Sequence, residues 1–193
     1  MRLFDCFTMD LRPDARKGTL RALLLRYFLA VDYRVVVRYR MAMWVRAKII
    51  PRKLGRLLAR RMLRRLSLCP GVEINCTEEI GEGFKVAHAH DIVIGVGARI
   101  GRNVTLYNGV TLGARRYADA EEDRADHSRY PILEDGVTVF SGAKVLGPVT
   151  VGRGSIIGAN SVVLESFPEN SVIAGVPARL IRSLEPCPAE TTP

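Results

Sequence analysis

The chain has little of several residue types, and each scarcity argues against a class of protein. Its 193 residues include one tryptophan, three histidines and four cysteines. The cysteines show no CxxC spacing and no cleavable secretory signal is expected ahead of them, so we interpret them as reduced thiols of a cytoplasmic protein. The most apolar stretch, 20–37, is interrupted by charged residues, which argues against a membrane span of about 20 apolar residues.

Acidic residues are absent from 34–65, where twelve Lys or Arg residues stand. The net charge is +9, so the rest of the chain sums to −3 and the basic character is local. Residues 17–66 are predicted to be helical, with a break at Pro51, and the basic segment 34–65 is predicted to be amphipathic. Its apolar side is expected either to pack on the rest of the protein or to rest on an anionic membrane. No nucleic-acid motif accompanies the charges, so no nucleic-acid partner is expected.

A six-residue period runs through the remainder of the chain. Thirteen positions, each six residues after the last apart from one two-residue slip and one insertion, are all Ile, Leu or Val. They are Ile74, Ile80, Val86, Ile94, Ile100, Leu106, Leu112, Leu133, Val139, Val145, Val151, Ile157 and Val163. The period matches neither an α-helix nor the two-residue alternation of an isolated strand. It predicts a parallel β-helix whose triangular coils take three hexads, or 18 residues, and stack their aliphatic side chains.

This pattern divides the chain into three parts. Residues 1–69 are predicted to form the basic helical region, 70–174 a mainly β domain, and 175–193 a tail. Residues 114–131 interrupt the hexads with a charged segment, which is expected to leave the coil as a loop and to carry recognition.

The hexads, the segment around His88, the charged loop and the ending Gly175-Val-Pro-Ala-Arg179 together resemble the serine acetyltransferase group of hexapeptide-repeat acyltransferases. That group includes relatives that acetylate capsule and exopolysaccharide sugars. The resemblance covers about 70–183. It implies a left-handed coil, acetyl-CoA as co-substrate, no metal, and a homotrimer with active sites in the grooves between subunits.

His88 is the strongest candidate for catalysis. Acyl transfer to a hydroxyl needs a general base, and imidazole titrates near neutral pH. In the resemblance, His88 occupies the position of the catalytic histidine, and Glu73 that of its acidic partner, which is usually Asp. Because Glu73 precedes His88 by fifteen residues, the two are expected on neighbouring coils, where a carboxylate could orient the imidazole.

The acceptor is predicted from two departures from the family pattern. The resemblance implies that Arg129 holds an amino acid carboxylate and that Asp91 also lies in the acceptor site. However, Tyr130 stands where serine acetyltransferases carry His, and Ala87 replaces an Asp that helps to bind serine. A neutral Tyr and a small Ala suit the apolar ring faces of a sugar. We therefore predict a saccharide acceptor from a polysaccharide pathway, with L-serine as the alternative.

The coenzyme candidates follow by position in the family. They are Gly113 and Ala114 near the thioester, Ser141 and Ala159 along the pantetheine arm, and Arg179 and Arg182 at the phosphates of CoA.

Two other functions remain open for such a coil. Zinc-dependent carbonic anhydrases share the fold, but His88, His90 and His127 lack the expected pair spaced by four residues. A catalytically silent β-helix that serves assembly is the other.

Overall fold

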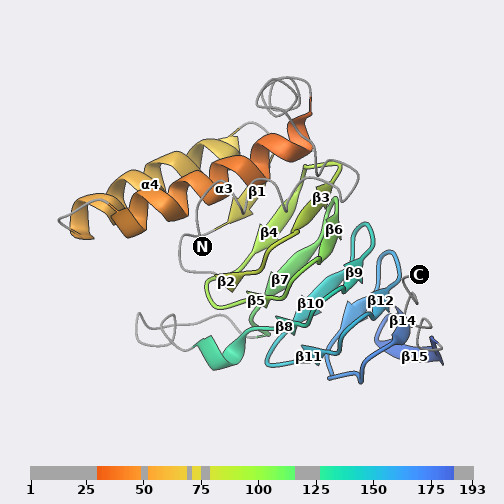
Figure 1. The fold of residues 1–193 in the computed structure, drawn as a ribbon. Coiled ribbons are helices and arrows are strands. Elements are labelled where there is room, and N and C mark those ends of the chain that lie inside the picture. The colour runs from red at the N-terminus through yellow and green to blue at the C-terminus, as the bar shows by residue number, and fades with distance from the viewer. Residues whose placement is uncertain (1–29, 49–51, 69–70, 75–78, 116–126, 185–193) are drawn as a thin grey trace, which may run out of the picture.

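The computed structural model describes residues 30–48, 52–68, 71–74, 79–115 and 127–184. Two helices, α3 (Val31–Lys48) and α4 (Arg52–Leu68), lie together at one end of a triangular prism of short strands (Figure 1). Pro51 stands between them, as expected from its inability to continue a helix. The predicted helical residues 17–29 lie outside the described residues.

Three sheets form the walls of the prism, and each takes every third strand. Sheet A contains β1 (Val72–Ile74), β4 (Ile92–Ile94), β7 (Thr111–Gly113), β10 (Lys144–Leu146) and β13 (Val162–Val163). Sheet B contains β2 (Glu79–Ile80), β5 (Arg99–Ile100), β8 (Ile132–Leu133) and β11 (Thr150–Val151). Sheet C contains β3 (Lys85–Ala87), β6 (Thr105–Tyr107), β9 (Thr138–Val139), β12 (Ile156–Ile157), β14 (Ser171–Gly175) and β15 (Ala178–Ser183). This arrangement confirms the predicted parallel β-helix of hexad repeats.

The prism has three edges, which we name after the sheets that the chain joins there: the A–B edge, the B–C edge and the C–A edge. Strand pairing shows how many residues each coil takes. Val93 pairs with Thr111, an offset of 18, whereas Val72 pairs with Ile92, an offset of 20. The first coil therefore carries two extra residues, and they lie between β3 and β4 on the C–A edge. The large insertion lies on the A–B edge, between β7 and β8.

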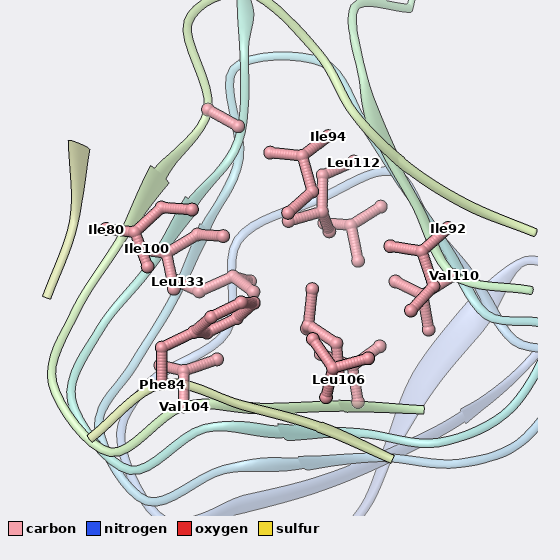
Figure 2. Close-up of a cluster of buried hydrophobic side chains, with 14 of the residues drawn as sticks. Ile80, Phe84, Ile92, Ile94, Ile100, Val104, Leu106, Val110, Leu112 and Leu133 are labelled. Carbon is pink, nitrogen blue, oxygen red and sulfur yellow. The ribbon is translucent and has the colours of Figure 1, made fainter. Parts of the chain in front are cut away.

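The core is the interior of the prism. All thirteen predicted aliphatic positions are buried. Figure 2 shows side chains from the three walls pointing into the same space, with residues of successive coils above one another, such as Ile80, Ile100 and Leu133. Burying one such side chain contributes about 1.5–3 kcal/mol relative to exposure, so the repeated stack stabilises the whole coil.

Glycines follow the aliphatic residues of sheet B because successive coils approach closely there. A Cβ at Gly101 would lie 2.7 Å from the backbone nitrogen of Asp135, and one at Gly152 would lie 2.3 Å from that of Glu169. Both distances are shorter than a carbon and a nitrogen tolerate without displacement of the backbone. Glycine recurs at this position of the hexad because a side chain there would collide with the backbone of the next coil.

The helices bury residues differently from the coil. Helix α3 has buried side chains on several sides, including Val35, Val36, Val37 and Tyr39, because it lies between α4 and strand β3. Among residues 53–64 of helix α4, the buried residues are Gly55, Ala59 and Leu63, which lie on one face. The apolar side of the basic region therefore packs on the protein along α3, while Leu54 and Leu57 of α4 remain exposed.

The carboxyl end differs from the predicted tail. After the Val176–Pro177 peptide, which is cis, β15 turns back and pairs antiparallel with β14. Residues 185–193 lie outside the described residues.

Candidate active site

The two-residue slip places His88 at the only enlarged corner of the C–A edge in the described coils. Its side chain is exposed and its backbone is left-handed, with φ of 58°. Few residues other than glycine adopt this conformation, and they persist where surrounding contacts determine it. The carbonyl of His88 accepts a hydrogen bond from the backbone N–H of His90 at 2.7 Å. An exposed imidazole, carried by a left-handed backbone at an irregular corner, is a candidate functional group.

Aromatic side chains continue along the same edge. The rings of His88 and Tyr107 have centroids 6.4 Å apart, and Tyr107 stacks on Phe140 at 4.9 Å. The resulting stripe crosses three successive coils. Tyr107 and Phe140 escaped the sequence analysis because they occupy outward positions that the hexad pattern leaves unconstrained.

A pocket of about 400 Å³ lies beside this stripe, between α3 and sheet C. Ala87, Tyr107 and Phe84 contribute to its wall from the prism, and Asp32 and Tyr33 from the helix. Ala87 is thus placed at the pocket, next in sequence to His88. The sequence offered no signal for Asp32, because only the fold brings α3 to this edge.

Glu73 and Asp91 both lie close to the corner that carries His88. Glu73 is exposed on the outer side of sheet A, in strand β1, and pairs with Val93 of the next coil. Within the described part of the chain no hydrogen bond joins Glu73 to His88, so their catalytic pairing stays a prediction. Asp91 is left-handed, with φ of 55°, and contacts His90 Nδ1 through Oδ2 at 3.3 Å.

The coenzyme candidates divide between two edges. Ser141 and Ala159 follow β9 and β12 on the C–A edge, on the same side as His88, and Ser141 Oγ donates to Asn108 Oδ1 at 2.9 Å. Gly113 and Ala114 lie at the A–B edge, where the Gly113 carbonyl accepts from Gly147 N–H at 2.9 Å.

The acceptor candidates from the charged loop also lie at the A–B edge. Arg129 ends the short 3₁₀ helix η2 (His127–Arg129) and is half-buried. The ring of Tyr130 packs against Gly95, so closely that a Cβ on that glycine would lie 2.7 Å from Tyr130 Cε1. Residues 116–126 of the loop lie outside the described residues.

Sheet A separates these two groups within one prism. From Asp91 to Gly95 the chain advances four residues, roughly 13 Å at about 3.3 Å per residue. His88 and Arg129 therefore belong to different edges of the same chain.

The two tail arginines lie on β15. Arg179 Nη1 donates to Glu165 Oε1 at 2.7 Å, and both side chains are more than half exposed. Arg182 is exposed.

Among the described residues, no helix is long and apolar enough to cross a membrane. In the same ranges, no group of three or more His, Cys, Asp or Glu side chains is arranged to hold a metal ion.

The chain is similar to known proteins over most of its length. The family model described as bacterial transferase hexapeptide (six repeats) matches residues 130–165. A serine acetyltransferase of Bacillus licheniformis is 43% identical over 58% of this chain and 48% of its own length. A serine acetyltransferase of Synechococcus elongatus is 35% identical over 88% of this chain and 62% of its own.

A solved structure extends the likeness to the fold. The structure described as serine acetyltransferase in complex with CoA has a TM-score of 0.74 and 30% identity, covering 93% of this chain and 69% of that one. The chain belongs to the hexapeptide-repeat, left-handed β-helix acyltransferases. It spans about half to three-fifths of the length of the two curated relatives in this family.

The similarity to serine acetyltransferases contradicts the predicted acceptor. The relatives above are serine acetyltransferases, so the predicted saccharide acceptor, its polysaccharide pathway and the predicted closeness to capsule O-acetyltransferases are wrong. The prediction depended on two side chains. Tyr130 packs on the wall of its own prism at Gly95, and Ala87 lines a pocket that also carries the carboxylate of Asp32.

Proposed function

We propose that the chain is a serine O-acetyltransferase that uses acetyl-CoA. The observation that carries the proposal is the exposed, left-handed His88 at the enlarged corner, in a chain that is 43% identical to a serine acetyltransferase over 111 residues. The position of Ser141 and Ala159 on the same edge supports a coenzyme groove that runs from this corner along the prism.

His88 acts as the general base in this proposal. Its imidazole takes the proton of the serine hydroxyl while the oxygen attacks the thioester carbonyl. The tetrahedral intermediate then expels the CoA thiolate, which recovers the proton from the imidazolium, so the products are O-acetylserine and CoA. Glu73 accepts a hydrogen bond from the second imidazole nitrogen in the assembled site and stabilises the imidazolium.

Substrate binding is assigned by position. Arg129 holds the serine carboxylate, since a planar guanidinium matches two carboxylate oxygens. Ala87, Asp91 and Tyr130 border the acceptor. Gly113, Ala114, Ser141 and Ala159 contact the coenzyme through their backbone or short side chains, and Arg179 and Arg182 face its phosphates.

The proposed active form is a homotrimer. A site that uses both His88 and Arg129 cannot form within one prism, because they lie on opposite edges of sheet A. Packing the C–A edge of one subunit against the A–B edge of the next brings the two groups into one groove, and cyclic symmetry repeats the groove three times.

The activity is tested by following thiol release from acetyl-CoA with L-serine, using the wild type and His88→Ala. We expect turnover of L-serine by the wild type only. If the wild type binds acetyl-CoA but acetylates no L-serine, while another hydroxyl compound is acetylated, the proposed acceptor is wrong.

The shared groove has its own test. His88→Ala and Arg129→Ala are each expected to be inactive as pure trimers. Co-expression of the two should restore part of the activity, because mixed trimers contain one groove with both residues intact. Absence of restored activity in verified mixed trimers would contradict a groove between subunits.

For the basic region we propose a peripheral contact of a cytoplasmic enzyme with anionic membranes. Helix α4 presents Leu54 and Leu57 to solvent among exposed cationic residues. These are Lys53, Arg56, Arg60, Arg61 and Arg64. Each cation near an anionic surface contributes about 1 kcal/mol. Flotation with anionic vesicles at low salt should recover the protein, flotation with neutral vesicles should not, and equal recovery would refute the contact.

A further inference from the structure

The peptide unit that follows His88 is held at both ends. Its carbonyl accepts from the N–H of His90 at 2.7 Å, within the corner itself. Its N–H, which belongs to Ala89, donates to Asp32 Oδ1 at 2.7 Å. Asp32 lies 57 residues earlier in the chain, in the first turn of α3. The slip on the C–A edge is therefore fastened to the helical region.

This hydrogen bond acts where the backbone is strained. His88 has φ of 58°, a conformation that its neighbours must maintain. Rotation of the following peptide would redirect the corner and with it the imidazole. Ala89 is 6% exposed, so its methyl group packs inside while its N–H reaches a carboxylate acceptor. Hydrogen bonds to ionised acceptors are stronger than neutral ones, which favours a single orientation.

Helix α3 is itself anchored to the prism. Arg40 is buried, and its guanidinium donates to the carbonyls of Ile80 at 2.7 Å and Gly81 at 2.5 Å, at the B–C edge. Eight residues separate Asp32 from Arg40, about 12 Å along a helix at 1.5 Å per residue. The helix thus holds the first coil at two places, and Asp32 is the one beside His88.

We propose that Asp32 is a positioning residue for the His88 base, which extends the proposed function and rests on it. Its carboxylate holds the Ala89 amide so that the left-handed corner presents the imidazole in one direction. A carboxylate in the first turn of a helix also interacts favourably with the helix dipole, and this alone would give Asp32 a purely structural role. The two roles make different predictions for the variants below.

The kinetic test compares Asp32→Ala, Asp32→Asn and Arg40→Gln in the full chain. Asp32→Ala should lower kcat by about 10- to 100-fold, since small displacements of a catalytic group have effects of this size, with the KM for acetyl-CoA within twofold. Asp32→Asn keeps an acceptor oxygen for Ala89 and should recover most of kcat. Arg40→Gln should lower Tm with little effect on kcat, because the carbonyls of Ile80 and Gly81 that Arg40 binds lie at the B–C edge.

Two kinetic results would overturn the proposal. One is a wild-type kcat in Asp32→Ala. The other is an Asp32→Asn enzyme as slow as Asp32→Ala, because the acceptor oxygen would then not be what matters.

A second measurement needs no turnover. The chain has only three histidines, so the imidazole signals of His88 can be assigned by NMR with His90→Gln and His127→Gln. In Asp32→Ala, the Ala89 amide should exchange faster with solvent and the His88 signals should shift, while both stay near wild type in Asp32→Asn. Unchanged exchange and unchanged shifts in Asp32→Ala would refute the positioning role. If the shifts occur but the wild type acetylates no L-serine, the proposed function is wrong, whereas the positioning of the His88 corner by Asp32 is supported.

Discussion

The B–C edge of the prism is regular, whereas the C–A edge has one irregular corner. The comparison indicates which corners stabilise the fold and which one can carry a catalytic group. At the B–C edge every coil turns in the same way, with a left-handed residue at the same place in each. These residues are Gly83, Asn103, Gly136, Gly154 and Asn170. At the C–A edge the first coil holds two additional residues, and His88 and Asp91 are the left-handed residues of that corner. A repeating corner supports the fold, whereas an irregular corner can place a reactive group.

The comparison predicts that the strongest effect on activity comes from the irregular corner. His88→Ala should lower kcat by about 10²- to 10⁴-fold, the usual contribution of a general base. Its Tm should fall only slightly, because the side chain is exposed and the remaining cost is that of placing alanine in the left-handed conformation of this corner. Steady-state kinetics and thermal unfolding measure the two effects, with His90→Ala as the matched control. Comparable losses of kcat in both variants would remove the distinction between these histidines.

The strongest effect on stability should come from the regular corner. Gly152→Ala introduces a Cβ 2.3 Å from the backbone nitrogen of Glu169, so adjacent coils must separate. We expect a loss of about 1–3 kcal/mol in the free energy of unfolding, typical of overpacking. Gly113→Ala is the control for stability, because its nearest neighbour would be at 3.6 Å, an ordinary contact. Chemical denaturation measures the free energy of unfolding of both variants. Equal values would show that adjacent coils separate at Gly152 without loss of stability.

A smaller effect is expected from the conformation of one corner residue. Asn103 has φ of 56° on the B–C edge. Alanine resists the left-handed region, so Asn103→Ala should lower stability by about 1–2 kcal/mol, whereas Asn103→Gly should lower it less. Chemical denaturation of the two variants tests this prediction, with a lower midpoint expected for Asn103→Ala than for Asn103→Gly. A more stable alanine variant would be inconsistent with a conformational cause.

The smallest effect should come from an ion pair on the same edge. The backbone N–H of Arg102 donates to Asp135, and this bond is the largest cause of the lowered pKa of that carboxyl group. The guanidinium of Arg102 also donates to Asp135, which lowers the pKa of Asp135 further and raises the pKa of Arg102. Because the folded pKa of Asp135 is below its unfolded value of about 3.9, the stabilisation is complete above that pH and is lost as pH falls through the folded value.

Asp135→Asn should therefore lower Tm slightly near pH 7, with the difference from wild type shrinking in acid. Glu79→Gln is a suitable comparison, because Glu79 meets Arg99 only at 3.9 Å and both side chains are well exposed. A Tm difference for Asp135→Asn that grows as the pH falls would contradict the assigned direction.

The sequence predicted the regular parts of the molecule and missed the irregular contacts. The period of six located all thirteen inward aliphatic residues, since each coil repeats the same environment. It also located the slip beside His88. It could not predict that Asp32 reaches Ala89 or that Arg40 reaches Ile80, because these bonds join a helix to backbone groups far away in the chain.

The acceptor shows a second limit. Tyr130 was interpreted from its chemistry alone, but its ring packs on Gly95, and only the structure shows that contact. The sequence analysis also did not predict that the candidate site residues lie on two different edges of the prism. The positions of the aliphatic residues alone do not assign the slip and the loop to particular edges.

The antiparallel strand β15 has a consequence for the edge of sheet C. A solenoid of parallel strands ends in a row of unpaired backbone groups that could recruit further chains. Here the edge strand β15 runs antiparallel to β14, while α3 packs against β3 at the opposite end of sheet C. Neither end of sheet C therefore presents a parallel edge on which another coil of the same kind would continue, which discourages polymerisation through this sheet.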